Sequence, residues 1–323
     1  MPLRISYCPF RLLFRHPFAT SHGVRDGTDS IFIRLEENDF TGYGEVTLPP
    51  YLQEKPEAVI ALLHRLAALR LGDSTALLKA LDDETVFGKN APGCRAGMHT
   101  AVIDLLGKKS QRTARELLLL PADSTAISLV TVGITPLDEL QERLHELPDS
   151  GALKVKVGHP GSAAMLKRIM ELDGRKLFLD ANQGFTRVED ALELATVVGE
   201  RLLGLEQPFA VGKDAMQRSL QGQVDICVYG DESIQSEADI GLQHKNFKGL
   251  NIKLMKCGGL DRAMKLAERA TALGMQVMLG SMSESSLGCT AMAQLAGKAQ
   301  ILDLDGPWLI KNDPFSGIGL ERG

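Results

Sequence analysis

The feature that most constrains the fold is a short apolar segment that recurs through the second half of the chain. The spacing is roughly 25 residues, about what one strand, one helix and two loops require. The stretches between the segments have helical periodicity, as in Arg187–Leu202. The segments are Leu129–Gly133, Leu153–Val157, Lys176–Asp180, Leu202–Glu206, Ile226–Gly230, Leu250–Leu254, Gln276–Gly280 and Ile301–Leu304.

This alternation of strands and helices predicts a (β/α) barrel, because such units form a parallel sheet and eight of them can close it. The alternative is an open doubly wound sheet, which is built from the same units. After the last segment the chain soon ends in residues such as Pro, Gly and Asn, so no eighth helix is expected there.

The first half of the chain is organised differently. Ile31–Glu36 and Thr41–Glu45 have the pattern of an antiparallel hairpin around a polar turn. Strands followed by helices, without alternation, predict a separate α+β domain over residues 1–120, and the barrel then occupies residues 121–323. The expected helices are Pro56–Leu69, Ser74–Leu81 and Cys94–Lys108.

The composition narrows the class of protein. A net charge of −5 argues against a nucleic-acid partner, which would favour a basic surface. The five cysteines are scattered and form no CxxC pair, which fits free thiols in a reducing cytosol. The N-terminus lacks an uninterrupted apolar signal segment, and no run approaches the ~20 apolar residues of a membrane span. We therefore expect a cytoplasmic enzyme with no membrane contact.

Acidic residues stand where three successive strands end. Asp180 and Glu206 close their segments and Asp231 follows the next one, at intervals of 26 and 25 residues. The carboxyl ends of barrel strands form the active-site face, so the three carboxylates should converge there. One such acid alone is more often a helix cap or a surface charge, but the even spacing favours a common site. Three buried like charges need a cation, and an all-oxygen set favours Mg²⁺.

Lysines accompany these acids. Lys154 and Lys156 lie two apart on the second strand and therefore share one face. Because Val155 and Val157 take the other face, the lysines should point into the barrel mouth; a solvated edge strand is the alternative. Lys253 ends the sixth strand, across the barrel. Lys256 falls in the expected following loop and is less expected to point inward.

Two lysines on opposite sides of a metal-bound carboxylate suit proton transfer at the adjacent carbon. An α-proton beside a carboxylate is very weakly acidic, and a divalent cation would stabilise the enediolate formed when it leaves. One neutral lysine can remove the proton from one face while the other, as ammonium, delivers one to the opposite face. Lys154 would favour a neutral base at Lys156 and would also bind the substrate carboxylate.

The segments LKVKVG, LDANQG, EQP, DES, NIKLMKCGGL, LGSMSES and LDLDG together resemble the muconate-lactonising subgroup of the enolase superfamily, over nearly the whole chain. The resemblance implies a (β/α)7β barrel capped by the N-terminal domain. Within the subgroup the chain is most similar to dipeptide epimerases of the L-Ala-D/L-Glu type. This implies Asp180, Glu206 and Asp231 as ligands of Mg²⁺, and Lys156 and Lys253 as the two bases.

The resemblance also implies residues that bind substrate. Asp303 and Asp305, two apart on the eighth strand, would hold the free ammonium of a dipeptide; solvated strand-end charge is the alternative. Thr131 on the first strand, and Ser281 and Ser283 after the seventh, match substrate-contacting positions. Serines in such loops are otherwise common turn formers.

Specificity is expected to lie in the N-terminal domain. The segment Thr20–Thr28 has few apolar residues and two glycines, which predicts a mobile lid. Arg25 falls where the resembled epimerases have an arginine that pairs with a glutamate side chain, although an exposed loop arginine is the alternative. A second loop, Thr47–Glu54, could present Tyr51 or Leu52.

Three functions remain open at this point. The first is an epimerase of dipeptides with an acidic second residue. By resemblance, such dipeptides would come from cell-wall peptides, and related enzymes often form homo-oligomers. The second is another reaction of the subgroup, a cycloisomerase or o-succinylbenzoate synthase, which would leave Asp303 and Asp305 unexplained. The third is a non-catalytic ligand-binding barrel, which the complete set of acids and lysines argues against.

Overall fold

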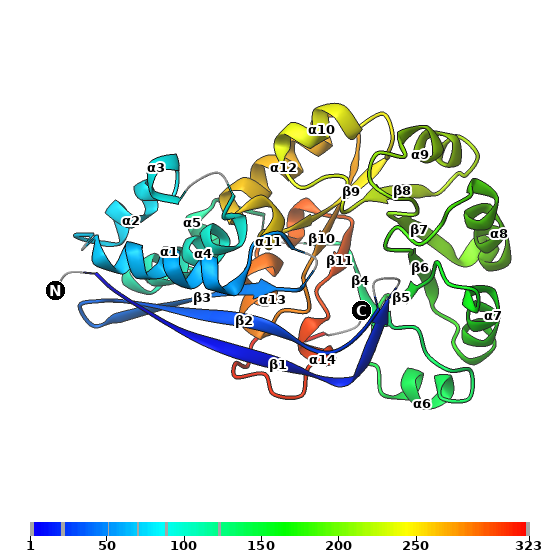
Figure 1. Cartoon of the computed structure of the whole chain (residues 1–323), viewed down its shortest axis with the longest axis horizontal. Coiled ribbons are helices and arrows are strands. Elements are labelled where there is room, and N and C mark those ends of the chain that lie inside the picture. Colours follow the sequence, from blue (N-terminus) through cyan, green and yellow to red (C-terminus); the bar gives the residue numbers. More distant parts are fainter. Residues whose placement is uncertain are drawn as a thin grey trace.

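The computed structural model describes residues 3–20, 23–50, 52–69, 71–87, 90–121 and 124–320. These residues form a three-stranded antiparallel sheet with its helices, here called the cap, and a closed barrel of eight strands (Figure 1). The predicted boundary near residue 120 falls between the last helix of the cap and the first barrel strand.

The barrel strands are parallel and follow one another around the barrel in sequence order, which confirms the predicted fold class. The open doubly wound sheet is therefore excluded. The strands are β4 (Ile127–Val132), β5 (Ala152–Lys156), β6 (Lys176–Asp180), β7 (Leu202–Glu206), β8 (Cys227–Gly230), β9 (Gly249–Lys253), β10 (Gln276–Gly280) and β11 (Ile301–Asp303).

Helices cover the outside of the barrel and bury one face each, as in α12, where Leu260, Ala263, Leu266, Ala267 and Ala270 are buried. The main helices are α6 (Leu140–His145), α7 (Ser162–Leu172), α8 (Val188–Val198), α9 (Asp214–Gln221), α10 (Glu237–Gln243), α12 (Leu260–Ala272) and α13 (Ser286–Ala293). Shorter helices are α11 (Leu254–Cys257) and α14 (Gly306–Leu309), with 3-10 turns at Gly199–Arg201 and Ala296–Lys298. Among the described residues the last strand is followed only by the four-residue α14, as the sequence predicts.

Apolar side chains fill the interior of the barrel. Phe178 and Tyr229 stack edge to face with their ring centroids 5.3 Å apart, and Leu129, Cys227 and Met278 belong to the same buried cluster. Because these side chains close the interior, the polar residues at the carboxyl ends of the strands form a mouth rather than a channel.

The cap sheet has the order β1 (Arg4–Thr20), β2 (Gly23–Glu37) and β3 (Phe40–Leu48). Its longest helix lies directly on β3, because Gly42, Gly44 and Gly97 leave no side chain between the two backbones. The helices are α1 (Pro56–Ala68), α2 (Ser74–Ala80), α3 (Glu84–Phe87), α4 (Pro92–Ser110) and α5 (Ala114–Leu117).

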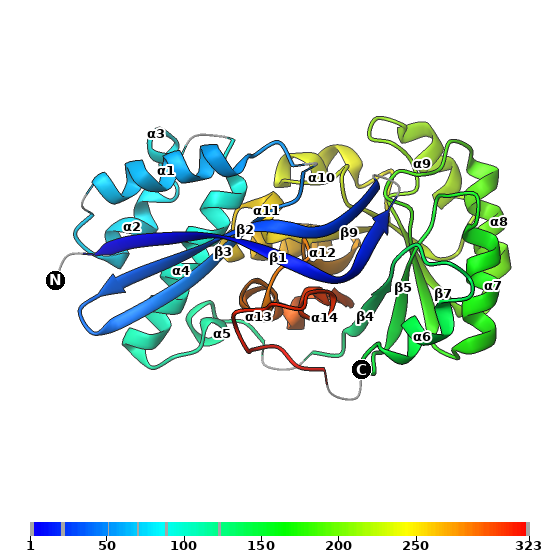
Figure 2. The ribbon, with the colours of Figure 1, turned by 60° about the horizontal axis from the view of Figure 1, so that its bottom comes forward.

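The expectation of a loop over Thr20–Thr28 is wrong for most of that segment. β2 begins at Gly23 and pairs with β1, so Arg25 lies opposite Phe18 in a hairpin whose far end reaches the barrel (Figure 2). Ser21, His22 and, in the second predicted loop, Tyr51 lie outside the described residues. Sequence reasoning missed β1 because it contains Pro9 and Pro17, which occur in strands mainly at sheet edges.

The contacts between the cap and the barrel include a buried ion pair and a segment that follows the last helix. Arg95 on α4 is buried and pairs with Asp261 on α12 at 2.8 Å. The segment after α14 lies along β1, where Phe14 and Ile310 form a bridge. None of the described helices combines the length and the apolar character needed to cross a bilayer.

Candidate active site

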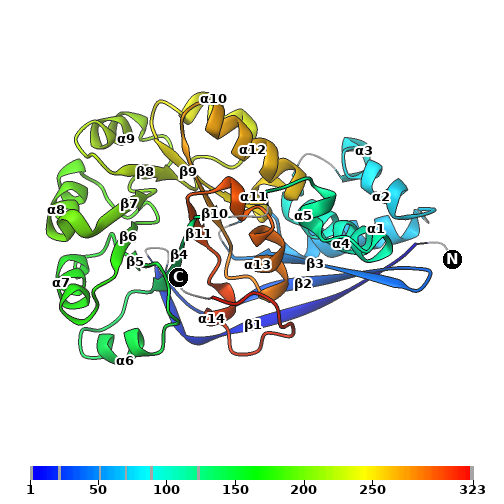
Figure 3. The ribbon, with the colours of Figure 1, turned by 180° about the vertical axis from the view of Figure 1, so that it is seen from behind.

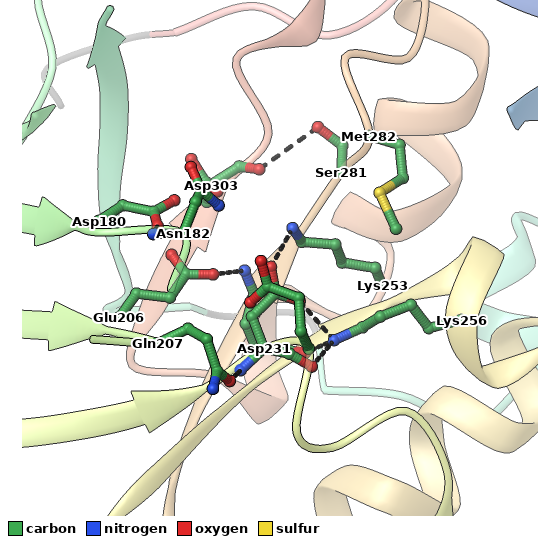
Figure 4. A network of polar contacts seen from close by, with 12 residues as sticks. Asp180, Asn182, Glu206, Gln207, Asp231, Lys253, Lys256, Ser281, Met282 and Asp303 are labelled. Atoms are coloured by element: carbon green, nitrogen blue, oxygen red, sulfur yellow. Dashed lines mark hydrogen bonds and ion pairs between the residues drawn. The ribbon is translucent and has the colours of Figure 1, made fainter. Parts of the chain in front are cut away.

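Three carboxylates lie at the mouth on successive strands. Asp180 ends β6, Glu206 ends β7 and Asp231 directly follows β8, and all three are buried (Figure 4). Asn251 on β9 donates to Glu206 Oε1 at 2.7 Å. The spacing along the sequence therefore corresponds to a real cluster of acids on adjacent strands.

Lys154 lies beneath this cluster in a nest of carboxylates. Its Nζ is 2.9 Å from Asp180, 2.7 Å from Glu206 and 2.6 Å from Asp303. Burial alone would lower the pKa of Lys154, but these three carboxylates raise it well above its ordinary value. Lys154 is therefore a fixed positive charge.

Lys156 lies two residues further along β5 and nearer the solvent. Its Nζ donates to Asp180 Oδ2 at 2.6 Å and to Asn182 Oδ1 at 3.0 Å. The ring of Phe18, from the cap strand β1, lies 5.8 Å from the same nitrogen. One lysine of the predicted pair is thus enclosed by barrel residues, whereas the other is reached by the cap.

Two lysines approach the cluster from β9 and the segment after it. Lys253 Nζ is 2.7 Å from Asp231 Oδ2. Lys256 donates to Asp231 Oδ1 at 2.5 Å and also to the backbone carbonyls of Ile234 and Asn251. Lys256 lies on the short helix α11 rather than in the expected loop, and its side chain turns back toward β8.

The strand order puts Lys156 and Lys253 on opposite sides of the mouth. β5 and β9 are four strands apart in either direction around the barrel. The three acids occupy β6, β7 and β8 on one side of the line between the lysines. On the other side, Thr131 lies on β4, Ser281 and Ser283 follow β10, and Asp303 ends β11.

The protonation of the three acids reflects their partners. Burial raises the pKa of Asp180, but Lys154 and Lys156 overcome it and hold the pKa well below the usual range. Asp231 behaves likewise because of Lys253 and Lys256. For Glu206, burial and the neighbouring Asp180 raise the pKa to about 8 in spite of Lys154. The lysines therefore do not fully neutralise the negative charge around Glu206.

These donors fit a hard divalent cation. The three acids offer buried carboxylate oxygens only, and the high pKa of Glu206 is what a carboxylate shows when a neutralising charge is missing. Across the described residues no three acidic, His or Cys side chains are already gathered closely enough to hold a metal. In this arrangement Lys154, Lys156 and Lys253 each pair with at least one of the three acids.

The opposite side of the mouth holds the two remaining acids. Asp303 ends β11, whereas Asp305 lies beyond the strand at the residue before α14, so the two do not both belong to the strand as predicted. Asp305 accepts from the backbone N–H of Thr131 at 2.6 Å. Burial and the neighbouring Asp303 raise the pKa of Asp305 to about 6. Asp303 Oδ1 has no hydrogen-bond partner among the described residues.

One pocket gathers the residues that the sequence singled out for catalysis and substrate binding. It is lined by Arg25, Thr131, Lys154, Lys156, Lys253, Ser281, Ser283, Asp303 and Asp305, together with Phe18, Asn182, Met282 and Leu309. A larger adjoining cavity of about 800 Å³ shares Phe18, Thr131 and Leu309 with it. The guanidinium of Arg25 lies 5.5 Å from the ring centroid of Phe14.

Two residues that sequence reasoning missed hold the acids in place. Asn182 lies two residues after Asp180 and has φ of 40°, a conformation that Asn tolerates. Its amide oxygen accepts from Lys156. Gln207 Oε1 accepts from the backbone N–H groups of Asp231 and Ser233 and thereby links β7 to the segment after β8. Their places within LDANQG and EQP were the available signal.

Comparison with known proteins agrees with this geometry. Residues 139–305 match the family model described as enolase C-terminal domain-like. The chain is 30% identical to an L-Ala-D/L-Glu epimerase of Bacteroides thetaiotaomicron, over 99% of this chain and 84% of the relative. It is 32% identical to a hydrophobic dipeptide epimerase of Roseobacter litoralis, over 99% and 95% of the two chains.

Among solved structures, the chain is similar to a dipeptide epimerase from Enterococcus faecalis complexed with Mg and the dipeptide L-Leu-L-Tyr. The TM-score is 0.89 at 25% identity, and the match covers 99% of this chain and 95% of the other. The full length of the match includes the cap as well as the barrel. The chain therefore belongs to the enolase superfamily and, within it, groups with the dipeptide epimerases, which are isomerases.

Proposed function

We propose that this protein is a Mg²⁺-dependent dipeptide epimerase that inverts the α-carbon of the carboxy-terminal residue. The observation that carries the proposal is that Lys156 and Lys253 line one pocket from strands on opposite sides of the barrel. A carbon held between two such amines can lose its proton to one and gain a proton from the other.

The proposed ligands of Mg²⁺ are Asp180, Glu206 and Asp231. The support is the chemistry of this donor set and the excess of negative charge at Glu206. Bound there, Mg²⁺ would supply positive charge that stabilises the negative charge developing on the substrate carboxylate.

The proton transfers balance between the two lysines. As a neutral amine, Lys156 takes the α-proton from one face and becomes an ammonium. As an ammonium, Lys253 delivers a proton to the opposite face and becomes neutral. In the reverse direction the two exchange roles, so no net proton enters or leaves. Lys154 remains charged throughout and binds the substrate carboxylate, because its three carboxylate neighbours hold its proton.

Asp303 and Asp305 are proposed to accept the free ammonium of the dipeptide. Support comes from the oxygen of Asp303 that has no hydrogen-bond partner in the described part of the chain and from the lining of the pocket by both acids. Cycloisomerase and o-succinylbenzoate synthase substrates lack an ammonium group, and a non-catalytic barrel needs no paired lysines. If Asp303→Asn leaves dipeptide turnover unchanged, this assignment fails.

For the second residue of the dipeptide we favour an acidic side chain, as in L-Ala-Glu. Arg25 lines the pocket from the cap, and a guanidinium pairs well with a carboxylate. The Bacteroides relative is named for this substrate. Thr131, Ser281 and Ser283 would complete the polar contacts to the peptide.

An apolar second residue is the other candidate. Phe18, Met282 and Leu309 line the same pocket, and the Roseobacter relative is named for hydrophobic dipeptides. The two candidates differ in whether Arg25 or these apolar side chains meet the substrate.

A dipeptide library in D₂O with Mg²⁺ separates them, because each epimerised dipeptide gains one mass unit at its α-carbon. Enrichment of dipeptides ending in Glu, with a Glu-to-Leu ratio of kcat/KM that falls at least about tenfold in Arg25→Met, is the expected result. The matched control is Arg15→Met, which removes an arginine of the adjacent cap strand β1 that lies outside this pocket. Preference for apolar residues would replace the acidic assignment. Absence of exchange with every dipeptide would reject the epimerase.

A further inference from the structure

Two fully buried carboxyl groups face each other outside the proposed catalytic set. Glu45 lies on the cap strand β3, and Glu284 lies in the barrel segment between β10 and α13. Both are at most 2% exposed. Two ionised carboxylates at such a place would repel strongly with no water to screen them. The pair therefore requires an explanation that the proposed reaction does not provide.

The two carboxyl groups come close at one point. A Cβ placed on Gly288 would lie 2.3 Å from Glu284 Oε2 and 3.0 Å from Glu45 Oε2. Gly288 is in the first turn of α13, which lies against β3 (Figure 3). The absence of a side chain at this position leaves room for the two oxygens of different domains.

Donors surround the carboxylate of Glu45 on all sides. Its Oε1 accepts from the hydroxyls of Ser30 and Thr47 and from the backbone N–H of Ser285. Its Oε2 accepts from the hydroxyl of Ser285 and the backbone N–H of Gly288. Burial raises the pKa of Glu45 on balance, whereas these donors and the N-terminal end of α13 oppose the rise by favouring the charged form.

Glu284 has the opposite environment. Its Oε1 accepts from the backbone N–H of Met282, and its Oε2 has no hydrogen-bond partner among the described residues. Burial and the neighbouring Glu45 raise the pKa of Glu284 to about 8, although Lys253 on β9 opposes this. The other titratable neighbour is Cys289 on α13, a buried thiol that stays neutral. A proton on Glu284 Oε2 would point at the charged Glu45.

We propose that Glu45 and Glu284 form a carboxyl pair sharing one proton, which holds cap strand β3 against the Ser281–Ser283 turn at the rim of the pocket and releases it when alkaline solution removes that proton. Glu284 is a positioning residue in this arrangement. The proposal relies on the proposed function only in treating that pocket as the substrate site.

The geometry gives the pair a direct effect on the pocket. Glu284 closes the turn through its bond to Met282, and Ser283 in that turn has φ of 63°. The backbone of Glu284 also packs against Gly306, since a Cβ there would lie 2.2 Å from the Glu284 carbonyl oxygen. Gly306 directly follows Asp305, so Glu284 contacts two segments that line the pocket, one through its side chain and the other through its backbone. A charge on Glu284 would in addition favour the ammonium form of Lys253.

The two glutamine variants separate the roles of the two acids. In Glu284→Gln the amide N–H₂ replaces the acid proton, and Oε1 can still accept from Met282. In Glu45→Gln either orientation of the amide turns an N–H₂ group toward donors that need an acceptor. We therefore expect E284Q to retain the melting temperature of the wild type at pH 7, and E45Q and Glu284→Ala to lose several degrees.

Titration gives a second signature. Because the pKa of Glu284 rises from its ordinary 4.5 to about 8, its contribution to stability is complete below pH 4.5 and is lost as the pH rises through about 8. The difference in melting temperature between wild type and E284Q should thus grow from pH 6 to about pH 8 and then level off. Infrared difference spectra should show a carboxylic-acid carbonyl band at pH 6 that disappears above pH 9 and that E284Q lacks.

Turnover reports the positioning role. With a dipeptide that the wild type epimerises, KM should rise in the wild type between pH 7 and pH 9 and rise less in E284Q. The melting and infrared measurements do not depend on turnover, so they decide the proposal even if the proposed dipeptide reaction fails its own test. If E284Q removes no carbonyl band, or melts as early as E45Q at pH 7, the pair does not share a proton and the proposal is wrong.

Discussion

Each side of the barrel mouth holds two lysines, one of which is more exposed than the other. Lys154 and Lys156 lie on β5, and across the mouth Lys253 ends β9 and Lys256 lies on α11. Lys154 has a side chain 2% exposed and pairs with three carboxylates, whereas the side chain of Lys156 is 11% exposed. Across the mouth, Lys256 is 4% exposed and also donates to backbone carbonyls, whereas Lys253 is 8% exposed.

The difference separates two uses of one residue type. The carboxylates around Lys154 raise its pKa, so it acts as a fixed charge, and Lys256 is held by Asp231 and by backbone carbonyls. In each pair the more exposed lysine is the one proposed to exchange protons. Each side of the mouth thus combines a structural charge with a proposed proton carrier.

The largest expected effect comes from removing the proposed proton carriers. Lys156→Ala and Lys253→Ala should each reduce epimerisation by about 10³–10⁴-fold, the usual contribution of a positioned acid or base. The remaining lysine should still exchange the α-proton of one epimer in D₂O. Mass gain measured separately from each epimer should therefore show opposite preferences in the two variants. If both variants prefer the same epimer, the two lysines do not serve opposite faces.

Removing a structural lysine should affect folding more than removing its neighbour. Lys256→Met leaves a buried carboxylate and several carbonyls without their donor, which should cost about 3–5 kcal/mol. Lys253→Met should cost less, because Asp231 keeps its contact with Lys256. Urea unfolding of the metal-free proteins measures both. Equal losses of stability would remove the distinction drawn between the two lysines.

A buried histidine outside the mouth should also make the stability of the protein depend on pH. His99 on α4 lies 3.3 Å from Asp261 at the cap–barrel joint, and burial lowers its pKa to about 4 in spite of that carboxylate. The unfolded chain accepts this proton below about pH 6.5, so stability is complete above that pH and falls as the pH decreases to about 4. The loss should be about 3 kcal/mol.

Urea midpoints of wild type and His99→Gln, compared from pH 7 to pH 4, check this expectation. In the variant the urea midpoint should depend less steeply on pH, because the titration of His99 is absent. The remaining pH dependence comes from the other titratable groups, including those of the mouth. If the two slopes coincide, His99 is protonated in the folded protein as readily as in the unfolded chain.

The smallest expected effect concerns the aromatic contact that distinguishes Lys156 from the enclosed lysines. Phe18→Leu keeps an apolar side chain but removes the ring near the ammonium, a contact worth about 0.5–1 kcal/mol. We expect kcat/KM to fall by about two- to fivefold. The neighbouring Phe10→Leu, on the same cap strand, is the matched control. A fall of a hundredfold would mean that Phe18 does more than pack against the lysine.

Much of the barrel could be predicted because its strands are buried on both faces and recur at a fixed interval. Asp180, Glu206 and Lys253 were found for the same reason, since the end of a barrel strand is a defined place in space. Asp305 was misplaced by the same reasoning, because β11 ends at Asp303, one residue before the predicted end at Leu304.

Other features depend on contacts between distant residues. Phe18 reaches Lys156 only because the hairpin crosses from the cap to the barrel, and nothing near it in the sequence marks this. Lys256 turns inward through a single four-residue helix, which has no periodicity to detect. The Glu45–Glu284 pair joins residues that lie in different domains, so no pattern along the chain relates them.

The segment after α14 affects the order in which the molecule can be completed during synthesis. Ile310 pairs with Phe14, Asn312 accepts from the backbone N–H of Leu13, and the ring of Phe315 packs against Phe32 and Tyr43. A chain that leaves the ribosome amino end first exposes β1 long before these residues emerge. Residues 310–312 contact the outer side of β1, so this side of the strand stays uncovered until they have been synthesised.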